Sequence, residues 1–344
     1  MVSYRHSFPQ SLRLILPISL FILSPAVLSA QEEKKEKDKT YVEKIKSLFS
    51  IKPYTNQNID LLMVNYNKST EDALWYRPAS GINFGGEVAF AFLHFNYQKN
   101  LPLFQPDLPD GFKASQQRFG FDAGGKIFGV MMTYQQSNGF YVYNQAMIPD
   151  SGYSNREQVI FRNDLISKTF GLDLRLTLSN KLSANAIFVQ SERQLKSKGA
   201  ISFIFGNRFN DFHGSSPFVP PHLQSFYPES ATVKEIWTNT IHIMPGYSYI
   251  AVAGYWNFGL SLYSGTGLQI RKYFTTTDED KLALKIPFLT RGKAGVSYNG
   301  KFFFTKFAVN FDFTTLGMKD ANFRWMQSYW EYSLGLRLYG KKKK

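Results

Sequence analysis

The most constraining feature of this sequence is a one-by-one alternation of apolar and polar residues. In residues 303–316, which read FFTKFAVNFDFTTL, Phe307, Val309 and Phe311 occupy one face, whereas Lys306 and Asp312 occupy the other. A period of two is typical of a β-strand whose two faces meet different surroundings. The apolar face would point into the core of a soluble sandwich, but toward lipid in an outer-membrane barrel with a polar interior.

Two further stretches indicate which of the two faces contacts water. Residues 172–178 (LDLRLTL) alternate Leu with Asp, Arg and Thr, and residues 332–339 (YSLGLRLY) repeat the pattern with Ser, Gly and Arg. Basic charge on a lipid-facing strand costs about 2–4 kcal/mol at the bilayer midplane, so we place the charged face inside. Because every backbone group in a bilayer must be hydrogen-bonded, strands can cross it only as a closed barrel.

The order of short turns and long loops predicts the topology. Short turns are expected at 90–91, 124–125, 179–180, 253–254 and 299–300, of which Asn299-Gly300 is the strongest hairpin signal. At 90–91 a β-bulge in one long strand is the alternative. Longer connections rich in Pro, Asp, Ser and Asn lie at about 68–80, 100–115, 136–166, 194–239, 270–288 and 316–324. The strand-like residues 139–144 and 200–209 are assigned to hairpins within these loops or to strand extensions.

Five short turns and six long loops join twelve strands, and ten or fourteen strands are the alternatives. The predicted fold is therefore all-β, a closed antiparallel transmembrane β-barrel over residues 58–340, followed by a basic tail at 341–344. Bacterial barrels of this kind keep their short turns in the periplasm. Both termini are accordingly expected on the periplasmic side, and the 194–239 loop outside.

Residues 1–30 have the layout of a signal peptide. Arg5 and Arg13 supply positive charge, and residues 14–23 form an apolar run that is too short for a transmembrane helix. We expect cleavage before Gln31, and therefore export to the cell outer membrane.

Residues 31–57 form a charged leader. Its first part, QEEKKEKDK at 31–39, has nothing to bury and is expected to be disordered. Apolar residues then recur at helical spacing over 42–49, which predicts a short amphipathic helix. This helix would plug or cap the periplasmic mouth or lie on the membrane surface, and a frayed leader is the alternative.

The amino-acid composition further restricts the class of protein and its partners. The absence of cysteine excludes disulfides, cysteine metal sites and a lipidated N-terminal cysteine. Aromatic residues make up 17% of the chain, as expected where the lipid face and interfacial girdles of a barrel are aromatic. The formal net charge is +14. In an exported protein this favours anionic lipid or surface polysaccharide over nucleic acid as a partner, and dispersed solvated lysines are the alternative.

The chain from Trp75 onward resembles an uncharacterised family of bacterial β-barrel proteins, the domain of unknown function 4421. The resemblance is carried by YRPASGINFGGEVAFAFLHFNYQKNLP (76–102), FDAGGKIFGVMMTYQQSNGFYV (121–142), FRNDL (161–165) and SERQLKSKGAISF (191–203). It implies an outer-membrane-type barrel and supplies no catalytic residues. At 196–201 the chain reads KSKGAI, which departs from the small-residue run expected after the glycine and weakens any role for this stretch.

Alternation places a set of charged side chains in the lumen: Glu87, Arg118, Asp122, Asp173, Arg175, Lys293, Lys306, Asp312 and Arg337. A polar lumen needs such residues merely to pair across strands, so a structural salt-bridge network is one interpretation. A selectivity lining for solutes of one sign is the other, although the mixed signs indicate no preference. A basic group expected near the outer rim, interpreted as an anion-binding site or as solvated loop charge, comprises Arg162, Arg193, Lys196 and Lys198.

No catalytic residue, metal site or cofactor is expected. His94 and His242 are predicted to face inward without a Ser beside them on the same strand face. His213 and His222 share a Pro-rich loop and would make a weak metal site at best.

The leading interpretation is a non-enzymatic outer-membrane channel or surface protein with a mixed-charge lumen. A hydrolase acting at the rim is one alternative, and a scaffold that organises lipid or partner proteins through long surface loops is another. A wide continuous lumen would favour the channel, and a filled lumen the scaffold. The expected partners are outer-membrane lipid, surface polysaccharide and the barrel-assembly machinery.

Overall fold

The computed structural model describes residues 41–45, 49–66, 69–90, 92–101, 108–143, 159–183, 185–227, 230–276, 281–317 and 322–339. The predicted signal peptide (1–30), the leader up to residue 40 and the basic tail (341–344) lie outside these residues. No helix among the described residues is long and apolar enough to cross a membrane.

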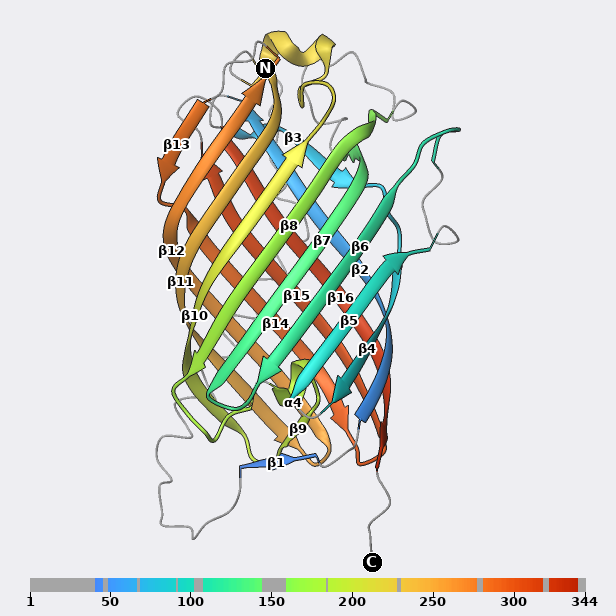
Figure 1. The fold of residues 1–344 in the computed structure, drawn as a ribbon, viewed down its shortest axis with the longest axis vertical. Helices are drawn as coiled ribbons and strands as arrows, with labels where there is room; N and C mark the ends of the chain where they lie inside the picture. The colour runs from blue at the N-terminus through green and yellow to red at the C-terminus, as the bar shows by residue number, and fades with distance from the viewer. Residues whose placement is uncertain are drawn as a thin grey trace, which may run out of the picture. The chain divides into compact units, whose positions relative to one another are not determined.

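Twelve long strands form a closed antiparallel barrel (Figure 1). Pairing of β12 with β11 closes it, and the first and last barrel strands, β2 and β16, are neighbours. The predicted fold class and strand number are confirmed. In order around the barrel the strands are β11 (Val233–Ala253), β10 (Lys198–His213), β8 (Phe161–Thr177), β7 (Phe128–Val142), β6 (Ser115–Gly124), β5 (Leu93–Asn100), β4 (Asn83–Phe90), β2 (Phe49–Tyr66), β16 (Asn322–Leu338), β15 (Phe303–Gly317), β14 (Phe288–Asn299) and β12 (Trp256–Thr275).

Two shorter strands extend the sheet at the end that carries the long loops. β13 (Lys281–Lys285) pairs with β12 in the same register as β14, and Pro287, which has no N–H to donate, lies between β13 and β14. β3 (Ser69–Pro78) pairs with both β2 and β7.

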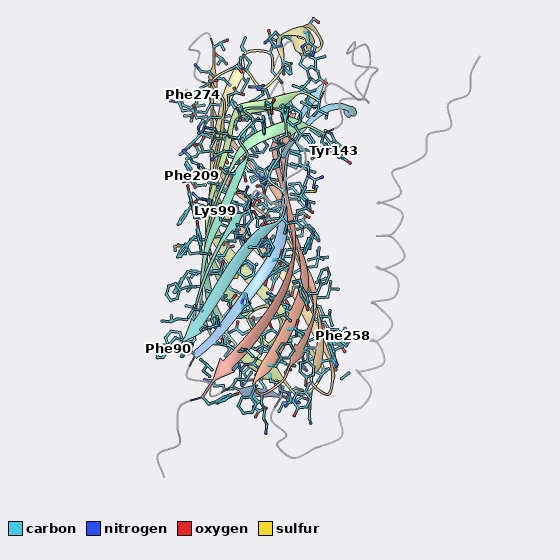
Figure 2. All side chains as sticks on the ribbon, turned by 90° about the vertical axis from the view of Figure 1, so that its right-hand side faces the viewer. Phe90, Lys99, Tyr143, Phe209, Phe258 and Phe274 are labelled. Atoms are coloured by element: carbon cyan, nitrogen blue, oxygen red, sulfur yellow. The ribbon has the colours of Figure 1, made fainter. Side chains whose placement is uncertain are left out.

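The alternation of residues 303–316 has the orientation predicted for a membrane barrel. Phe307, Val309 and Phe311 are 41–45% exposed on the outside of β15, whereas Lys306 and Asn310 are buried on the inside. Exposed apolar side chains recur on the outside of other strands, among them Val88, Leu172 and Ile241. Aromatic residues stand toward both ends of this surface: Phe90 and Phe258 near the short-turn end, and Phe209 and Phe274 near the long-loop end (Figure 2). The outer surface therefore matches a bilayer.

Four of the five predicted short turns are present. They connect β4 to β5, β6 to β7, β11 to β12 and β14 to β15, all at one end of the barrel. β4 and β5 pair with each other from Phe90↔Leu93 onward, so they are two antiparallel strands and not one long strand with a bulge. The six longer connections lie at the opposite end. We call the two ends the short-turn end and the long-loop end.

The strand predicted to follow the turn at Ser179–Asn180 is wrong. The strand that follows β8 is β10 (198–213), not residues 181–190, so residues 178–197 form a longer connection at the short-turn end. The loop predicted at 194–239 is shorter in the structure, where it comprises residues 214–232 between β10 and β11. The assignment of residues 200–209 to a loop hairpin or a strand extension is wrong, because these residues belong to the barrel strand β10. The outer face of β10 turns polar toward its end, which weakens the alternation there. Residues 139–142 extend β7, as predicted.

The amphipathic helix predicted over 42–49 is also wrong. Val42–Lys44 form the short strand β1, and β2 begins at Phe49, so the barrel starts before residue 58. The inward face of β2 carries Lys52, Asn56 and Asp60, all buried. Because this face is polar while the outward face mixes apolar and polar residues, the strand alternation in β2 is weak in the sequence.

Candidate functional site

The long-loop end of the barrel is filled by apolar side chains. Residues from the strand ends pack there against the loop at 214–232, whose centre is the 3-10 helix η3 (Pro221–Phe226). The ring of Phe212 lies 5.2 Å from Phe140, 5.1 Å from Phe218 and 5.9 Å from Trp325 between centroids. This cluster, which we call the apolar cap, comprises Leu62, Val64, Leu74, Tyr76, Phe140, Val142, Leu165, Phe212, Phe218, Val219, Leu223, Tyr227, Val233, Ile236, Tyr273, Phe323 and Trp325.

Arg162 ties the 214–232 loop to the barrel wall. Its Nη1 donates to the carbonyls of Pro217 (2.8 Å) and Phe218 (3.1 Å), and its Nε pairs with Asp164 Oδ1 at 2.8 Å. Burial acts to raise the pKa of Asp164, but the hydrogen bonds and charge of Arg162, with hydrogen bonds from Ser216, outweigh it and hold that pKa below its usual range. Arg162 is thus fully engaged in holding the cap.

The short-turn end is filled by the connection between β8 and β10. This segment, residues 178–197, folds into the barrel mouth as a short helix α4 (Asn185–Phe188) and the strand β9 (Glu192–Gln194). β1 pairs with β9, from Val42↔Gln194 to Lys44↔Glu192. We call residues 178–197 the plug.

Side chains from the barrel wall hold the plug by its backbone. Asn299 Nδ2 donates to the carbonyls of Ala186 (3.1 Å) and Glu192 (2.8 Å), and Lys306 Nζ donates to the carbonyl of Phe188 (2.9 Å). Arg337 Nη2 donates to the Gln190 carbonyl at 2.6 Å. The plug is therefore anchored by the Asn299 amide and by charge-assisted hydrogen bonds from Lys306 and Arg337, and the charge-assisted bonds are the stronger kind.

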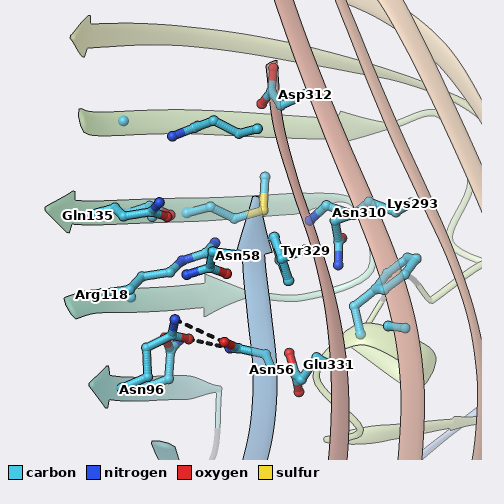
Figure 3. Close-up of a pocket in the computed structure, with 18 of the residues that line it drawn as sticks. Asn56, Asn58, Asn96, Arg118, Gln135, Lys293, Asn310, Asp312, Tyr329 and Glu331 are labelled. Carbon is cyan, nitrogen blue, oxygen red and sulfur yellow. Dashed lines mark hydrogen bonds between the residues drawn. The ribbon is translucent and has the colours of Figure 1, made fainter. Parts of the chain in front are cut away.

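A polar chamber of about 170 Å³ lies in the lumen between the two filled ends. Phe188 and Val189 of the plug form part of its wall, together with amide and hydroxyl groups from β2, β5, β7 and β16 (Figure 3). A smaller hollow of about 40 Å³ adjoins it and shares Phe188 and Lys293. The charged residues that line the chamber are Asp60, Glu87, Arg118, Asp122, Asp173, Arg208, Arg291, Lys293, Lys306, Asp312 and Glu331.

One ion cluster lies on the side of β2, β4, β15 and β16. Lys52 Nζ is 2.7 Å from Glu87 Oε2 and 3.9 Å from Glu331 Oε1, and Lys306 Nζ is 2.8 Å from Glu331 Oε1. His94 Nδ1 is 3.5 Å from Glu87 Oε1. The two lysines and two glutamates neutralise one another.

A second ion cluster spans β8, β10, β11, β14 and β15. Arg291 Nη1 is 2.6 Å from Asp173 Oδ2, and its Nε is 2.9 Å from Asp312 Oδ2. Arg208 Nη1 is 2.7 Å from Asp312 Oδ2. His242 Nε2 lies 3.1 Å from Asp173 Oδ1. Here too, two arginines balance two aspartates.

The structure places the predicted lumen residues inside the barrel. They are found in three places: the chamber, the smaller hollow and the contact with the plug. Glu87, Arg118, Asp122, Asp173, Lys293, Lys306 and Asp312 line the chamber. Arg175 lines the smaller hollow, and Arg337 holds the plug. Sequence reasoning missed Lys52, Asp60, Arg208, Arg291 and Glu331. Arg208 was missed because residues 200–209 of β10 were not recognised as a barrel strand. Arg291 could have been found, because it is two residues from Lys293 and therefore on the same strand face.

The predicted basic group at the outer rim does not exist. Arg162 lies at the long-loop end and is engaged with Asp164 and the loop carbonyls. Arg193, Lys196 and Lys198 lie at the opposite end, because Arg193 and Lys196 belong to the plug and Lys198 begins β10. Arg193 pairs with Glu43 at 3.8 Å and stacks on the ring of Tyr255.

The inward histidines have carboxylates as neighbours. His94 faces Glu87 and His242 faces Asp173, and no serine hydroxyl is hydrogen-bonded to either ring among the described residues. Ser248 Oγ is instead 3.1 Å from the Tyr263 hydroxyl. His213 lies on β10 with its Nδ1 3.0 Å from Asp211, and His222 is exposed on η3. The described part of the chain contains no cluster of three or more His, Asp or Glu side chains that could hold a metal.

Residues 36–336 match a family model described as a domain of unknown function, number 4421. The chain belongs to this family. No curated protein matches the sequence. The family assignment confirms the resemblance carried by residues 76–102, 121–142, 161–165 and 191–203.

Several solved structures resemble this fold. They include the outer membrane protease OmpT from Escherichia coli (6% identical, covering 84% of this chain and 96% of that one, TM-score 0.38). The translocator domain of the autotransporter NalP from Neisseria meningitidis is 7% identical, with 95% and 97% covered and a TM-score of 0.38. The toluene transporter TodX from Pseudomonas putida is 8% identical, with 85% and 91% covered and a TM-score of 0.30. Similarity at this level concerns the fold alone.

Proposed function

We propose that this protein is a non-enzymatic, surface-exposed outer-membrane barrel with a closed lumen, which acts as a scaffold through its long-loop end. The observation that carries the proposal is the filling of both mouths by the protein's own chain, the apolar cap at one end and the plug at the other. An open diffusion channel needs a continuous polar path, and neither end offers one. In the cell, the short-turn end faces the periplasm and the long-loop end faces outward.

The long-loop end is suited to holding a partner because its loop is fixed. Arg162 fixes the 214–232 loop by hydrogen bonds to three consecutive residues, Ser216, Pro217 and Phe218. A preorganised surface loses less conformational entropy on binding than a flexible one. Outer-membrane lipid and surface polysaccharide are the partners that its position favours, and the barrel-assembly machinery inserts the barrel.

The lumen chemistry supports a role without catalysis. A hydrolase needs a nucleophile and a base within hydrogen-bonding reach, held by a third group. His94 and His242 each have the carboxylate but no hydroxyl partner among the described residues. Purified barrel should hydrolyse neither lipids nor peptides. If wild type turns over either substrate, and His94→Asn or His242→Asn abolishes this in a folded barrel, the protein is an enzyme.

Conductance in a planar lipid bilayer tests the closed lumen. Wild-type barrel should insert without stable conductance steps. A variant that lacks both 182–196 and 216–230, each replaced by Asn-Gly, serves to show that inserted barrels can be detected. Stable steps from wild type would make the protein an open channel. Steps from the variant that lacks only 182–196 would make it a channel gated at the periplasmic end.

A further inference from the structure

Two cations in the chamber stand outside both ion clusters. Arg208, Arg291 and Lys306 each pair with a carboxylate. No ion pair joins Arg118 or Lys293 to a carboxylate anywhere in the described ranges. Arg118 Cζ instead lies 4.4 Å from the centroid of the Tyr329 ring, and Lys293 Nζ lies 5.4 Å from the centroid of Phe188. Both side chains are partly buried, and a cation inside a protein usually has a partner of opposite charge.

These two cations lie on either side of Tyr329 in the chamber wall (Figure 3). Lys293 is opposite Asn310 across β14 and β15, Asn310 is opposite Tyr329, and Tyr329 is opposite Asn58. The four residues form one cross-strand row. Arg118 reaches toward Asn58 and Tyr329 from the facing wall, while Lys293 and Asn310 lie on the other side of Tyr329 (Figure 3).

The side chain of Asn58 is an independent indication that the chamber binds a ligand. Its side chain is 4% exposed and lines the chamber. Neither its Nδ2 nor its Oδ1 has a hydrogen-bond partner among the described residues. An unsatisfied buried amide costs about 1–3 kcal/mol, so such a group in a folded protein usually meets a ligand or water. Its Nδ2 can donate to the same anion as the two cations.

The charges that remain after pairing decide the ligand class. Outside the two neutral clusters, the chamber and the adjoining hollow hold three cations, Arg118, Arg175 and Lys293, against two carboxylates, Asp60 and Asp122. Asp60 already accepts hydrogen bonds from Gln135 and Ser137. The excess is one positive charge. A guanidinium and an ammonium beside an amide match the oxygens of a carboxylate.

We propose that the chamber binds one small monocarboxylate between Arg118, Lys293 and Asn58. A volume of about 170 Å³ accommodates a carboxylate of a few carbon atoms with ordered water. The site lies inside the barrel, away from the surface through which the scaffold acts. Because both ends are filled, the ligand enters as the barrel closes during folding or when the plug moves.

Retention of radiolabelled acetate tests this proposal. The full chain is refolded from urea into detergent with labelled acetate, or with labelled phosphate in a parallel arm, and then freed of unbound anion by gel filtration. Wild type should retain about one equivalent of acetate and at least tenfold less phosphate. Arg118→Gln and Lys293→Gln, tested separately, should each retain at least tenfold less acetate. Lys99→Gln removes a cation from the outer face of β5, away from the chamber and the plug, and should retain acetate within twofold of wild type.

Folding of each variant is checked by its heat-modifiable migration in gel electrophoresis. Folded wild type that retains no acetate overturns the proposal, whatever the variants do. Retention of phosphate in place of acetate, or equal retention by Arg118→Gln and Lys293→Gln, also overturns it. These outcomes leave the conductance result untouched, so failure of the anion site and failure of the closed lumen are distinguishable.

Discussion

His242 Nε2 and Asp173 Oδ1 lie 3.1 Å apart although their strands, β11 and β8, are not neighbours. β10 runs between them, and the residue in register with both is Gly206. A Cβ at this position would lie 2.1 Å from Asp173 Oδ1 and 2.7 Å from His242 Nε2. The missing side chain therefore allows the ion cluster to reach across a whole strand.

Gly206→Ala should break this contact. The added methyl group must displace one of the two side chains in a packed lumen, and overpacking of this kind typically costs about 1–3 kcal/mol. Gly171→Ala is the matched control, because Gly171 also faces inward and its nearest neighbour would be Arg208 Nε at 3.9 Å. The measurement is the free energy of unfolding in urea for each detergent-solubilised variant. Equal losses for the two variants would show that Gly206 makes no special room.

Asp164→Asn should destabilise the cap in a pH-dependent way. The pKa of Asp164 is depressed in the fold, chiefly by Arg162 acting against burial. Its contribution is therefore present above the pKa of an unfolded Asp, about 3.9, and is lost as pH falls toward the lower folded pKa. At pH 7 the variant should lose about 1–3 kcal/mol through its weaker hydrogen bonds to Arg162.

Thermal unfolding at pH 7 and near pH 3 checks this expectation. The gap between wild type and Asp164→Asn should narrow at the lower pH. Asp110→Asn, which changes an exposed loop carboxylate, should match wild type at both. A gap that stays constant with pH would mean that the charge of Asp164 does not matter.

Arg337→Gln should loosen the plug. Arg337 donates to the carbonyls of Gln190 and Gly300 and to Asn299, and hydrogen bonds from charged donors are worth about 1.5–3 kcal/mol each. The chain has no native cysteine, so Ala186→Cys gives a single buried thiol in the plug. Its rate of maleimide labelling should rise on the order of tenfold with Arg337→Gln, because local opening becomes less costly. Arg324→Gln, at the other end of β16, should leave the rate unchanged.

The two faces of β15 should differ in their surroundings. A spin label at Val309 is expected to contact lipid, and one at Asn310 to be shielded from it, because Val309 is exposed on the outside and Asn310 is buried inside. Relaxation by oxygen, which partitions into lipid, reports the difference. Lipid contact at Asn310 would reverse the orientation of the barrel wall.

The fold was predictable because the membrane imposes a simple rule on each strand. Where one face is purely apolar, as at Phe307, Val309 and Phe311, the period of two determines both strand and orientation. The rule failed where a strand carries polar residues on both faces, as in β2 and in the part of β10 near the long-loop end. It also failed for the plug, because an apolar stretch such as residues 186–189 reads as a strand until its partner is known.

The candidate site was predictable only residue by residue. Alternation placed Asp173 and Lys293 in the lumen, but it could not show that Asp173 meets Arg291, which is 118 positions later in the chain. Such pairs depend on register and on which strands face each other across the lumen. The contact of His242 with Asp173 depends further on a glycine in a strand that was read as a loop.

Thiol labelling inside the chamber tests the closed lumen most directly. Thr133 lines the chamber, and Thr133→Cys places a single thiol there, while His222→Cys places one on the exposed η3. Reconstituted barrel of each variant is treated with a small charged methanethiosulfonate from either side of the membrane. The filled ends predict that the His222→Cys thiol reacts at once from one side, and that the Thr133→Cys thiol reacts from neither side until the barrel is unfolded. Rapid reaction of the Thr133→Cys thiol in the folded barrel would contradict the closed lumen.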